Sequence, residues 1–195
     1  MHTPYSAGYQ VYSSLVFRYF QLQDFVDAPI SGGEVGAQTG KLTIMCGGDP
    51  AHFYAAEPVM DSYAKATRLM GDSGAGQLTK MINQICIAGT LQGLAEGIHF
   101  AQKAGLKMED VLGAIGKGAA QSWQMDNRAL TMDDDKYDFG FAVDWMRKDL
   151  GIAIRTAEQI GADLTLAKQV DRYYEEVQSM GGNRWDTSSL LKRLK

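Results

Sequence analysis

The side chain best suited to chemistry in this sequence is Lys80, which falls in the second turn of a predicted helix. Asn83 and Gln84 follow three and four residues later, so their side chains reach the same region of the helix surface. The neighbouring positions are largely apolar, and burial disfavours the charged form of an amine. Such a lysine can donate and accept protons. The alternative interpretation is a surface lysine whose ammonium reaches water along the helix edge.

Two other segments carry groups that would complement this amine. Ser31, Gly32 and Gly33 directly follow a predicted strand, and a glycine-rich turn there can present backbone amides and a hydroxyl to a carboxylate. The same residues are also typical of a plain tight turn. Lys148 and Asp149 lie within a predicted helix and, taken alone, are ordinary for a surface pair. The conjunction of the three segments, rather than any one of them, favours a functional site.

A dinucleotide fingerprint is imitated at the start of the same helix. Gly74, Gly76 and Thr79 have nearly the required spacing, but Thr79 replaces the third glycine. A true fingerprint is followed by a short helix and a returning strand, whereas a very long helix is predicted here. The segment therefore does not predict a pyrophosphate site of its own.

The sequence predicts no metal site. Asp133, Asp134 and Asp135 suggest a calcium loop, but Lys136 and Tyr137 occupy positions that should alternate with oxygen ligands. The three histidines have no metal-ligand spacing and receive no role.

Composition narrows the class of protein. The chain has 195 residues, 45% of them hydrophobic, which suits one or two globular domains. A net charge of -4 without a basic block argues against nucleic acid as a partner. No run of about 18 apolar residues occurs, and Arg18 interrupts the apolar stretch near the start, so neither a membrane span nor a signal peptide is expected. Cys46 and Cys86 are far apart, which fits a reducing, cytoplasmic setting.

Turn signals and periodicity predict an α/β part followed by an all-α part. Strands are expected at 25–30 and 41–46, with a third at 67–70, and Asp49 with Pro50 predicts a helix through residue 62. After Gly71 helical periodicity dominates. The expected helices cover residues 75–104, 108–116, 120–131, 141–160, 165–179 and 187–194.

Glycine recurs every fourth residue in the longest predicted helix, at Gly89, Gly93 and Gly97. This spacing keeps the three on nearly one face. Each costs about 1 kcal/mol relative to alanine inside a helix. We therefore expect a close backbone contact with another helix to compensate.

Three ordered motifs resemble those of the β-hydroxyacid dehydrogenases, a family that includes 3-hydroxyisobutyrate dehydrogenase and tartronate semialdehyde reductase. The run from Asp27 to Gly33, with Gly36, Ala37 and Gly40, is similar to the substrate-loop signature of the family. The catalytic signature, glycine-x-glycine-x-x-x-lysine-x-x-asparagine, is met by Gly74, Gly76, Lys80 and Asn83. The late lysine-aspartate-leucine signature is met by Lys148, Asp149 and Leu150, and Trp185 to Ser188 resembles the closing segment.

The resemblance implies a fold and an activity. Residues 1–71 would form a partial C-terminal portion of an NAD(P)-binding Rossmann-type domain, that is, its last strands. Residues 72–195 would form an all-helical domain that carries the catalytic lysine and pairs subunits in a homodimer or higher homo-oligomer. The implied reaction is hydride transfer between NAD or NADP and a small hydroxy acid or its semialdehyde.

The resemblance also assigns roles to residues. Lys80 would exchange the proton, Asn83 would orient Lys80 or the substrate, and Ser31, Gly32 and Gly33 would hold the substrate carboxylate. Lys148, Gly74 and Gly76 would contact the cofactor. Gln121, Ser122 and Trp123, between two predicted helices, are further candidates for lining the substrate pocket, although a tryptophan at a helix start is also typical of a core.

The similarity begins near Asp24, and nothing in Met1 to Gln23 resembles the glycine fingerprint with which relatives begin. We therefore expect a sequence that is N-terminally truncated, or altered in its first two dozen residues, with poor cofactor affinity because the pyrophosphate cradle is missing. The competing interpretation is a helical oligomerisation or binding module without catalysis of its own.

Overall fold

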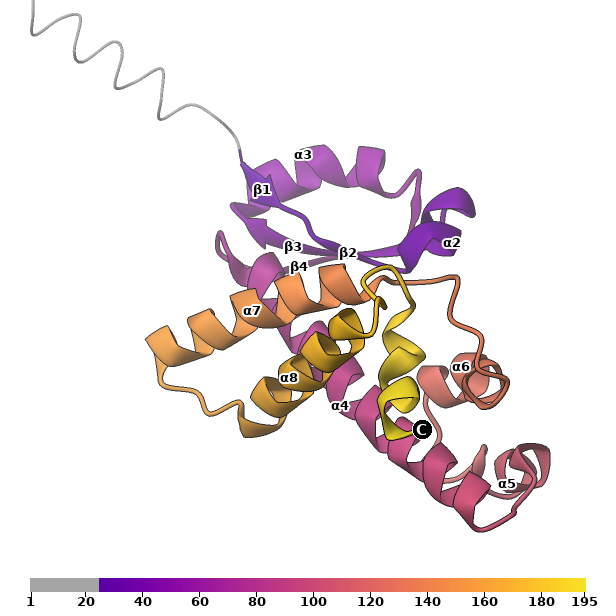
Figure 1. The fold of residues 1–195 in the computed structure, drawn as a ribbon. Helices are drawn as coiled ribbons and strands as arrows, with labels where there is room; N and C mark the ends of the chain where they lie inside the picture. Colours follow the sequence, from indigo (N-terminus) through magenta and orange to yellow (C-terminus); the bar gives the residue numbers. More distant parts are fainter. Residues whose placement is uncertain (1–24) are drawn as a thin grey trace, which may run out of the picture.

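The structure is a computed structural model that describes residues 25–195. The expectation for Met1 to Gln23 lies outside this part of the chain. The described residues form a small sheet with two short helices, followed by a helical region (Figure 1). This order confirms the predicted α/β part followed by an all-α part.

The sheet is built around β3 (Leu42–Gly48). Two short strands, β1 (Val26–Asp27) and β2 (Ile30–Ser31), pair with it antiparallel, and β4 (Ala64–Gly71) pairs with it parallel. We expected a single strand at 25–30, and this was wrong. Pro29 lies between β1 and β2 and has no N–H to donate to a ladder, which accounts for the break.

Two short helices accompany the sheet. Helix α3 (Pro50–Met60) begins as predicted, with the Asp49 carboxylate accepting a hydrogen bond of 2.7 Å from the Ala51 amide. Helix α2 (Gly33–Gln38) was not predicted, because only a turn was expected at 31–33. The backbone has positive φ angles where α2 begins, 131° at Gly32 and 62° at Gly33, and glycine adopts such angles without strain.

The helical region contains α4 (Ala75–Lys103), α5 (Met108–Ile115), α6 (Trp123–Asp133), α7 (Val143–Ile160), α8 (Thr165–Ser179) and the 3-10 helix η1 (Thr187–Leu194). These bounds agree with the predicted helices to within a few residues. Figure 1 shows α4 running from the sheet through the helical region, with α7 and α8 on one side and α5 and α6 towards its far end.

The main hydrophobic core lies along α4 and joins all six of these helices. It includes Leu91 and Ile98 of α4, Leu150 of α7, Tyr174 of α8 and Leu190 of η1, each 1% exposed or less. A separate, smaller core under the sheet contains Ile44, Phe53 and Met60, among others. The C-terminal segment is fixed by Asp186, which accepts hydrogen bonds from the Phe141 amide (2.9 Å) and the Arg128 guanidinium (3.1 Å).

One buried carboxylate joins the sheet to the long helix. Asp27 of β1 is 6% exposed, and its two oxygens accept from the backbone amides of Gly74 (2.6 Å) and Gln77 (2.9 Å) in the first turn of α4. A helix N-terminus has unpaired N–H groups and favours negative charge. Asp27 therefore caps α4 from a distant strand and fixes where the helix starts on the sheet.

Within residues 25–195, no helix combines the length and the apolar character that a membrane span requires. In the same part of the chain, no group of three or more acidic, histidine or cysteine side chains is arranged to hold a metal ion.

Replacing Asp27 should destabilise the fold more than replacing a local cap. We expect Asp27→Ala to lower the free energy of unfolding by about 2 to 3 kcal/mol, because it leaves two amides of α4 without their acceptor in a partly buried place. Asp49→Ala, which removes the exposed cap of α3, should cost about 1 kcal/mol. Urea denaturation of both variants makes the comparison, and equal losses would contradict the account of Asp27.

Candidate active site

Lys80 lies in the second turn of α4 and is half-buried. Burial lowers the pKa of its amine below the ordinary value of 10.5. Two charges act on the same amine: the Asp149 carboxylate raises the pKa, and the Lys148 ammonium lowers it further. Burial is the larger influence, so the amine releases its proton more readily than an exposed lysine does.

The polar neighbours of Lys80 form a continuous set of contacts across two helices. The Asn83 amide donates to the Gln84 side-chain oxygen (2.8 Å), and the Gln84 amide nitrogen donates to Asp149 of α7 (2.7 Å). The other oxygen of Asp149 lies 2.9 Å from the Lys148 ammonium. Two motifs that are 65 residues apart in sequence are thus joined by one hydrogen bond between Gln84 and Asp149.

The polar neighbours of Lys80 differ sharply in the exposed fraction of their side chains. Gln84 is only 2% exposed and the Asp149 side chain 13%, whereas the Lys148 side chain is 65% exposed. A buried amide and a partly buried carboxylate therefore lie near two amines, one half-buried at Lys80 and one open to solvent at Lys148. The first is suited to proton exchange and the second to contact with a large anionic ligand.

The glycines ahead of Lys80 have packing functions in this structure. Gly74 has a φ of 94°, and its amide donates to Asp27. Gly76 is buried, and a Cβ there would overlap the carbonyl oxygen of Met45 in β3. Glycine at position 76 therefore lets α4 approach the sheet closely, and a role of Gly74 and Gly76 in cofactor binding stays a prediction.

The turn at Ser31, Gly32 and Gly33 ends β2 and begins α2. Ser31 pairs with Thr43, and Asp27 pairs with Gly47 further along the same strand β3. The turn and the cap of α4 are therefore held by one strand, on which α4 also packs. The contact of this turn with a substrate stays a prediction.

The predicted pocket residues at 121–123 lie at the start of α6, where Ser122 is the N-cap and Trp123 the first helical residue. The Ser122 hydroxyl caps α6 by accepting from the Met125 amide (3.0 Å), and Gln121 donates to Asp126 (2.6 Å). Trp123 is 58% exposed, with the Arg128 guanidinium 5.0 Å from its ring centroid. Ser122 shares a groove with Thr90, which lies about 15 Å beyond Lys80 along α4 at about 1.5 Å per residue. The structure does not bring this segment into the set of contacts around Lys80.

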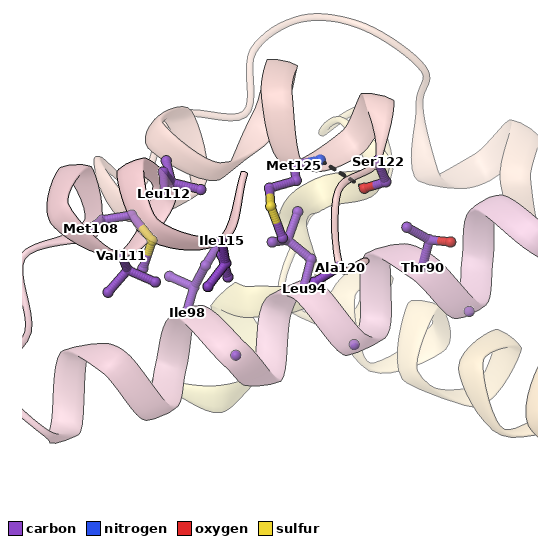
Figure 2. Close-up of a pocket in the computed structure, with 13 residues that line it drawn as sticks. Thr90, Leu94, Ile98, Met108, Val111, Leu112, Ile115, Ala120, Ser122 and Met125 are labelled. Atoms are coloured by element: carbon purple, nitrogen blue, oxygen red, sulfur yellow. Dashed lines mark hydrogen bonds between the residues drawn. The ribbon is translucent and has the colours of Figure 1, made fainter. Parts of the chain in front are cut away.

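The groove at Ser122 has a cavity volume of about 420 Å³ and lies between α4, α5 and the start of α6 (Figure 2). Its lining is mostly apolar and consists of Gly89, Thr90, Gly93, Leu94, Gly97, Ile98, Met108, Val111, Leu112, Ile115, Ala120, Ser122 and Met125.

The expected close contact of the glycine stripe with another helix was wrong for the described chain. A Cβ at Gly93 or Gly97 would meet no atom within 4 Å, and one at Gly89 would lie 3.3 Å from a Leu166 methyl group. The stripe instead lines the groove. Packing within residues 25–195 therefore does not require glycine at 93 and 97.

Two models of known protein families match this chain. A family model described as "NAD-binding of NADP-dependent 3-hydroxyisobutyrate dehydrogenase" matches residues 74–194. A second, described as "NAD binding domain of 6-phosphogluconate dehydrogenase", matches residues 21–72. This chain belongs to the β-hydroxyacid dehydrogenase family. The resemblance carried by the three sequence motifs is thereby confirmed.

Individual oxidoreductases are similar to most of this chain. An uncharacterized oxidoreductase of Shewanella frigidimarina is 62% identical over 170 residues, which are 87% of this chain and 58% of that protein. The 2-hydroxy-3-oxopropionate reductase of Escherichia coli is 33% identical, over 88% of this chain and 59% of the reductase. The crystal structure of 3-hydroxyisobutyrate dehydrogenase from Salmonella typhimurium superposes with a TM-score of 0.77 at 32% identity, over 86% of this chain and 59% of that one. The chain thus spans about three fifths of the length of these relatives.

Two residues that organise the site were not assigned functions from sequence. Asp27 and Asp149 both lie inside the motifs that carried the resemblance, yet neither motif indicates that Asp27 caps α4 or that Asp149 accepts from Gln84. The only available signal was the acidic residue itself: Asp27 stands between Val26 and Ala28, and Asp149 follows Lys148.

Proposed function

We propose that this chain carries the proton-exchanging part of an NAD(P)-dependent hydroxyacid dehydrogenase, with Lys80 as general acid and base. The observation that carries the proposal is a half-buried amine of lowered pKa, next to a buried amide and a partly buried carboxylate. Membership of the dehydrogenase family supports it.

Lys80 would act on the oxygen of the substrate carbon that is oxidised or reduced. In reduction of a semialdehyde, the ammonium donates a proton to the oxygen as negative charge develops on it; in oxidation of the alcohol, the neutral amine accepts that proton. The nicotinamide, when bound, supplies or takes up the hydride. The lowered pKa makes the neutral, proton-accepting form easier to reach than in an exposed lysine, which helps one amine to serve both directions.

Substrate orientation would come from two further places. The left-handed turn at Gly32 and Gly33, with the Ser31 hydroxyl, offers donors for a carboxylate. Asn83 already donates to Gln84, and its own carbonyl oxygen is the acceptor that it would offer to Lys80 or to the substrate. We propose these residues as the substrate-binding set.

Lys148 fits the cofactor by its chemistry. It is an exposed cation fixed to Asp149 beside the proposed proton donor, and both NAD and NADP carry phosphate charges. Gly74 and Gly76 fit less directly, because the Gly74 amide is already bonded to Asp27 and Gly76 is buried under β3. Their contribution to cofactor binding would be to shape the start of α4.

The substrate class we propose is a small β-hydroxy acid or its semialdehyde. Named relatives support it: besides the E. coli reductase, the 2-(hydroxymethyl)glutarate dehydrogenase of Eubacterium barkeri is 35% identical over 87% of this chain. We further propose that residues 1–71 belong to the cofactor domain and 72–195 to the catalytic helical domain. The free cysteines Cys46 and Cys86 support a reducing, cytoplasmic setting.

Replacing Lys80 tests the proposed function. Because the chain spans 58% of the Shewanella relative, the assay should use a fusion in which that relative supplies the part of its length that this chain does not match. Lys80→Ala is expected to reduce turnover of semialdehydes about 10²- to 10⁴-fold. Lys103→Ala, at the exposed end of the same helix, should leave turnover unchanged. Undiminished turnover in the Lys80 variant would remove the amine from the mechanism.

A second proposal concerns assembly, and it is favoured by the open glycine stripe. We propose that a second copy of the chain occupies the groove beside Gly93 and Gly97, since both glycines reduce helix stability and neither is needed for packing within the described chain. The apolar lining suits burial against such a partner. The chain could serve as an oligomerisation module even without catalysis.

Filling the groove tests this assembly. Gly93→Leu should shift the chain from a dimer or higher oligomer to a monomer in light scattering, because the added side chain occupies the groove. The fold should survive, since a Cβ at this position meets no atom. Lys107→Ala, outside the groove lining, is the control. A parent chain that is monomeric at all concentrations, or a variant that assembles as the parent does, would refute the proposal.

A further inference from the structure

Gln84 is a buried polar side chain for which the proposed reaction has no direct use. It lies four residues after Lys80 on α4 and is 2% exposed. Its oxygen accepts from Asn83, and its nitrogen donates to Asp149 and also lies 3.9 Å from the Met146 sulfur. Burying an amide is costly unless its hydrogen bonds are made. Gln84 is therefore held in place by contacts on both sides.

The bond from Gln84 decides where the Asp149 carboxylate points. One oxygen of Asp149 is fixed by Gln84 and the other contacts Lys148, whose side chain is largely exposed. An ion pair with an exposed lysine restrains a carboxylate only slightly. The buried hydrogen bond is the firmer of the two restraints, and without it Asp149 could turn with Lys148 towards solvent.

The position of Asp149 matters to Lys80 because its charge favours the ammonium form. Two other charged groups on these elements bond elsewhere: Asp27 of β1 to the backbone of α4, and Arg147 of α7 to Asp171 and Glu175 of α8. Lys148 acts in the opposite sense to Asp149. The carboxylate held by Gln84 is thus the main opposing influence to burial at this amine.

We propose that Gln84 is a positioning residue, which keeps Asp149 beside Lys80 so that the amine can be protonated again after each proton transfer. This inference rests on the proposed function of Lys80 for its catalytic meaning. The geometry itself is testable without turnover. Gln84 acts through Asp149 and needs no contact with substrate or cofactor.

The experiment measures the pKa of Lys80 in the intact chain. Amines are labelled with acetic anhydride at a series of pH values, and mass spectrometry reports the rate at Lys80, with the exposed Lys103 as internal reference. Gln84→Met keeps the approximate volume but removes the donor. It is expected to lower the pKa of Lys80 by about half a unit or more. Asp149→Asn should lower it at least as far.

The double variant separates this mechanism from a general disturbance. If Gln84 acts through Asp149, adding Gln84→Met to Asp149→Asn should cause no further change in the pKa of Lys80. Two additive shifts would overturn the proposal, as would an unchanged pKa in Gln84→Met beside a shifted one in Asp149→Asn. Gln84→Asn, which is one methylene shorter, should give the same lowering and replaces Gln84→Met if that variant does not fold.

The outcome is independent of the proposed function. An unchanged pKa in the Gln84 variants would refute the role of Gln84 and leave Lys80 as the proton donor. Undiminished turnover of the Lys80→Ala fusion would refute the proton donor and leave the link between Gln84 and Asp149 intact.

Discussion

The hydrogen bonds that the Asp27 carboxylate accepts from the first turn of α4 determine where Lys80 and its polar neighbours can lie. Asp27 lies in β1 and accepts hydrogen bonds from the amides of Gly74 and Gln77, at the start of a helix of 29 residues. Lys80, Asn83 and Gln84 sit on the next turns of that helix. A rigid helix transmits the position of its first turn to its later ones, so the strand fixes the amine. The close approach also requires glycine at position 76, because any side chain there would overlap β3.

Helix α4 contributes residues to two different sites. Its first turns contribute the polar set with Asp149 and Lys148 of α7, and its middle turns contribute the glycine-lined groove with α5 and α6. The first combines the buried Gln84 with the exposed Lys148, whereas the lining of the second is mostly apolar. We propose chemistry for the first and contact with a second copy for the second. Both depend on α4 remaining straight and well anchored.

Much of the architecture could be predicted from sequence because the signals were local. Asp49 and Pro50 predicted the start of α3, and the 3.6-residue periodicity after Gly71 predicted the helices. Helix α2 could not be predicted, since Gly32 and Gly33 are equally typical of a turn. The contacts of Asp27 with Gly74 and of Gln84 with Asp149 join segments 47 and 65 residues apart, and no local pattern encodes such a pairing. The glycine stripe was assigned to close helix packing, because spacing alone does not say which surface a helix face meets.

The most direct test of the account is the pH dependence of hydride transfer in both directions, measured in single turnovers with the fused chain. Reduction needs the protonated amine of Lys80, so its rate should fall as pH rises through a pKa below 10.5, and oxidation should rise through the same pKa. Lys80→Ala should abolish both dependences. Rates that vary with pH in the same sense in both directions, or that keep their profile without Lys80, would contradict the claim that this amine carries the proton.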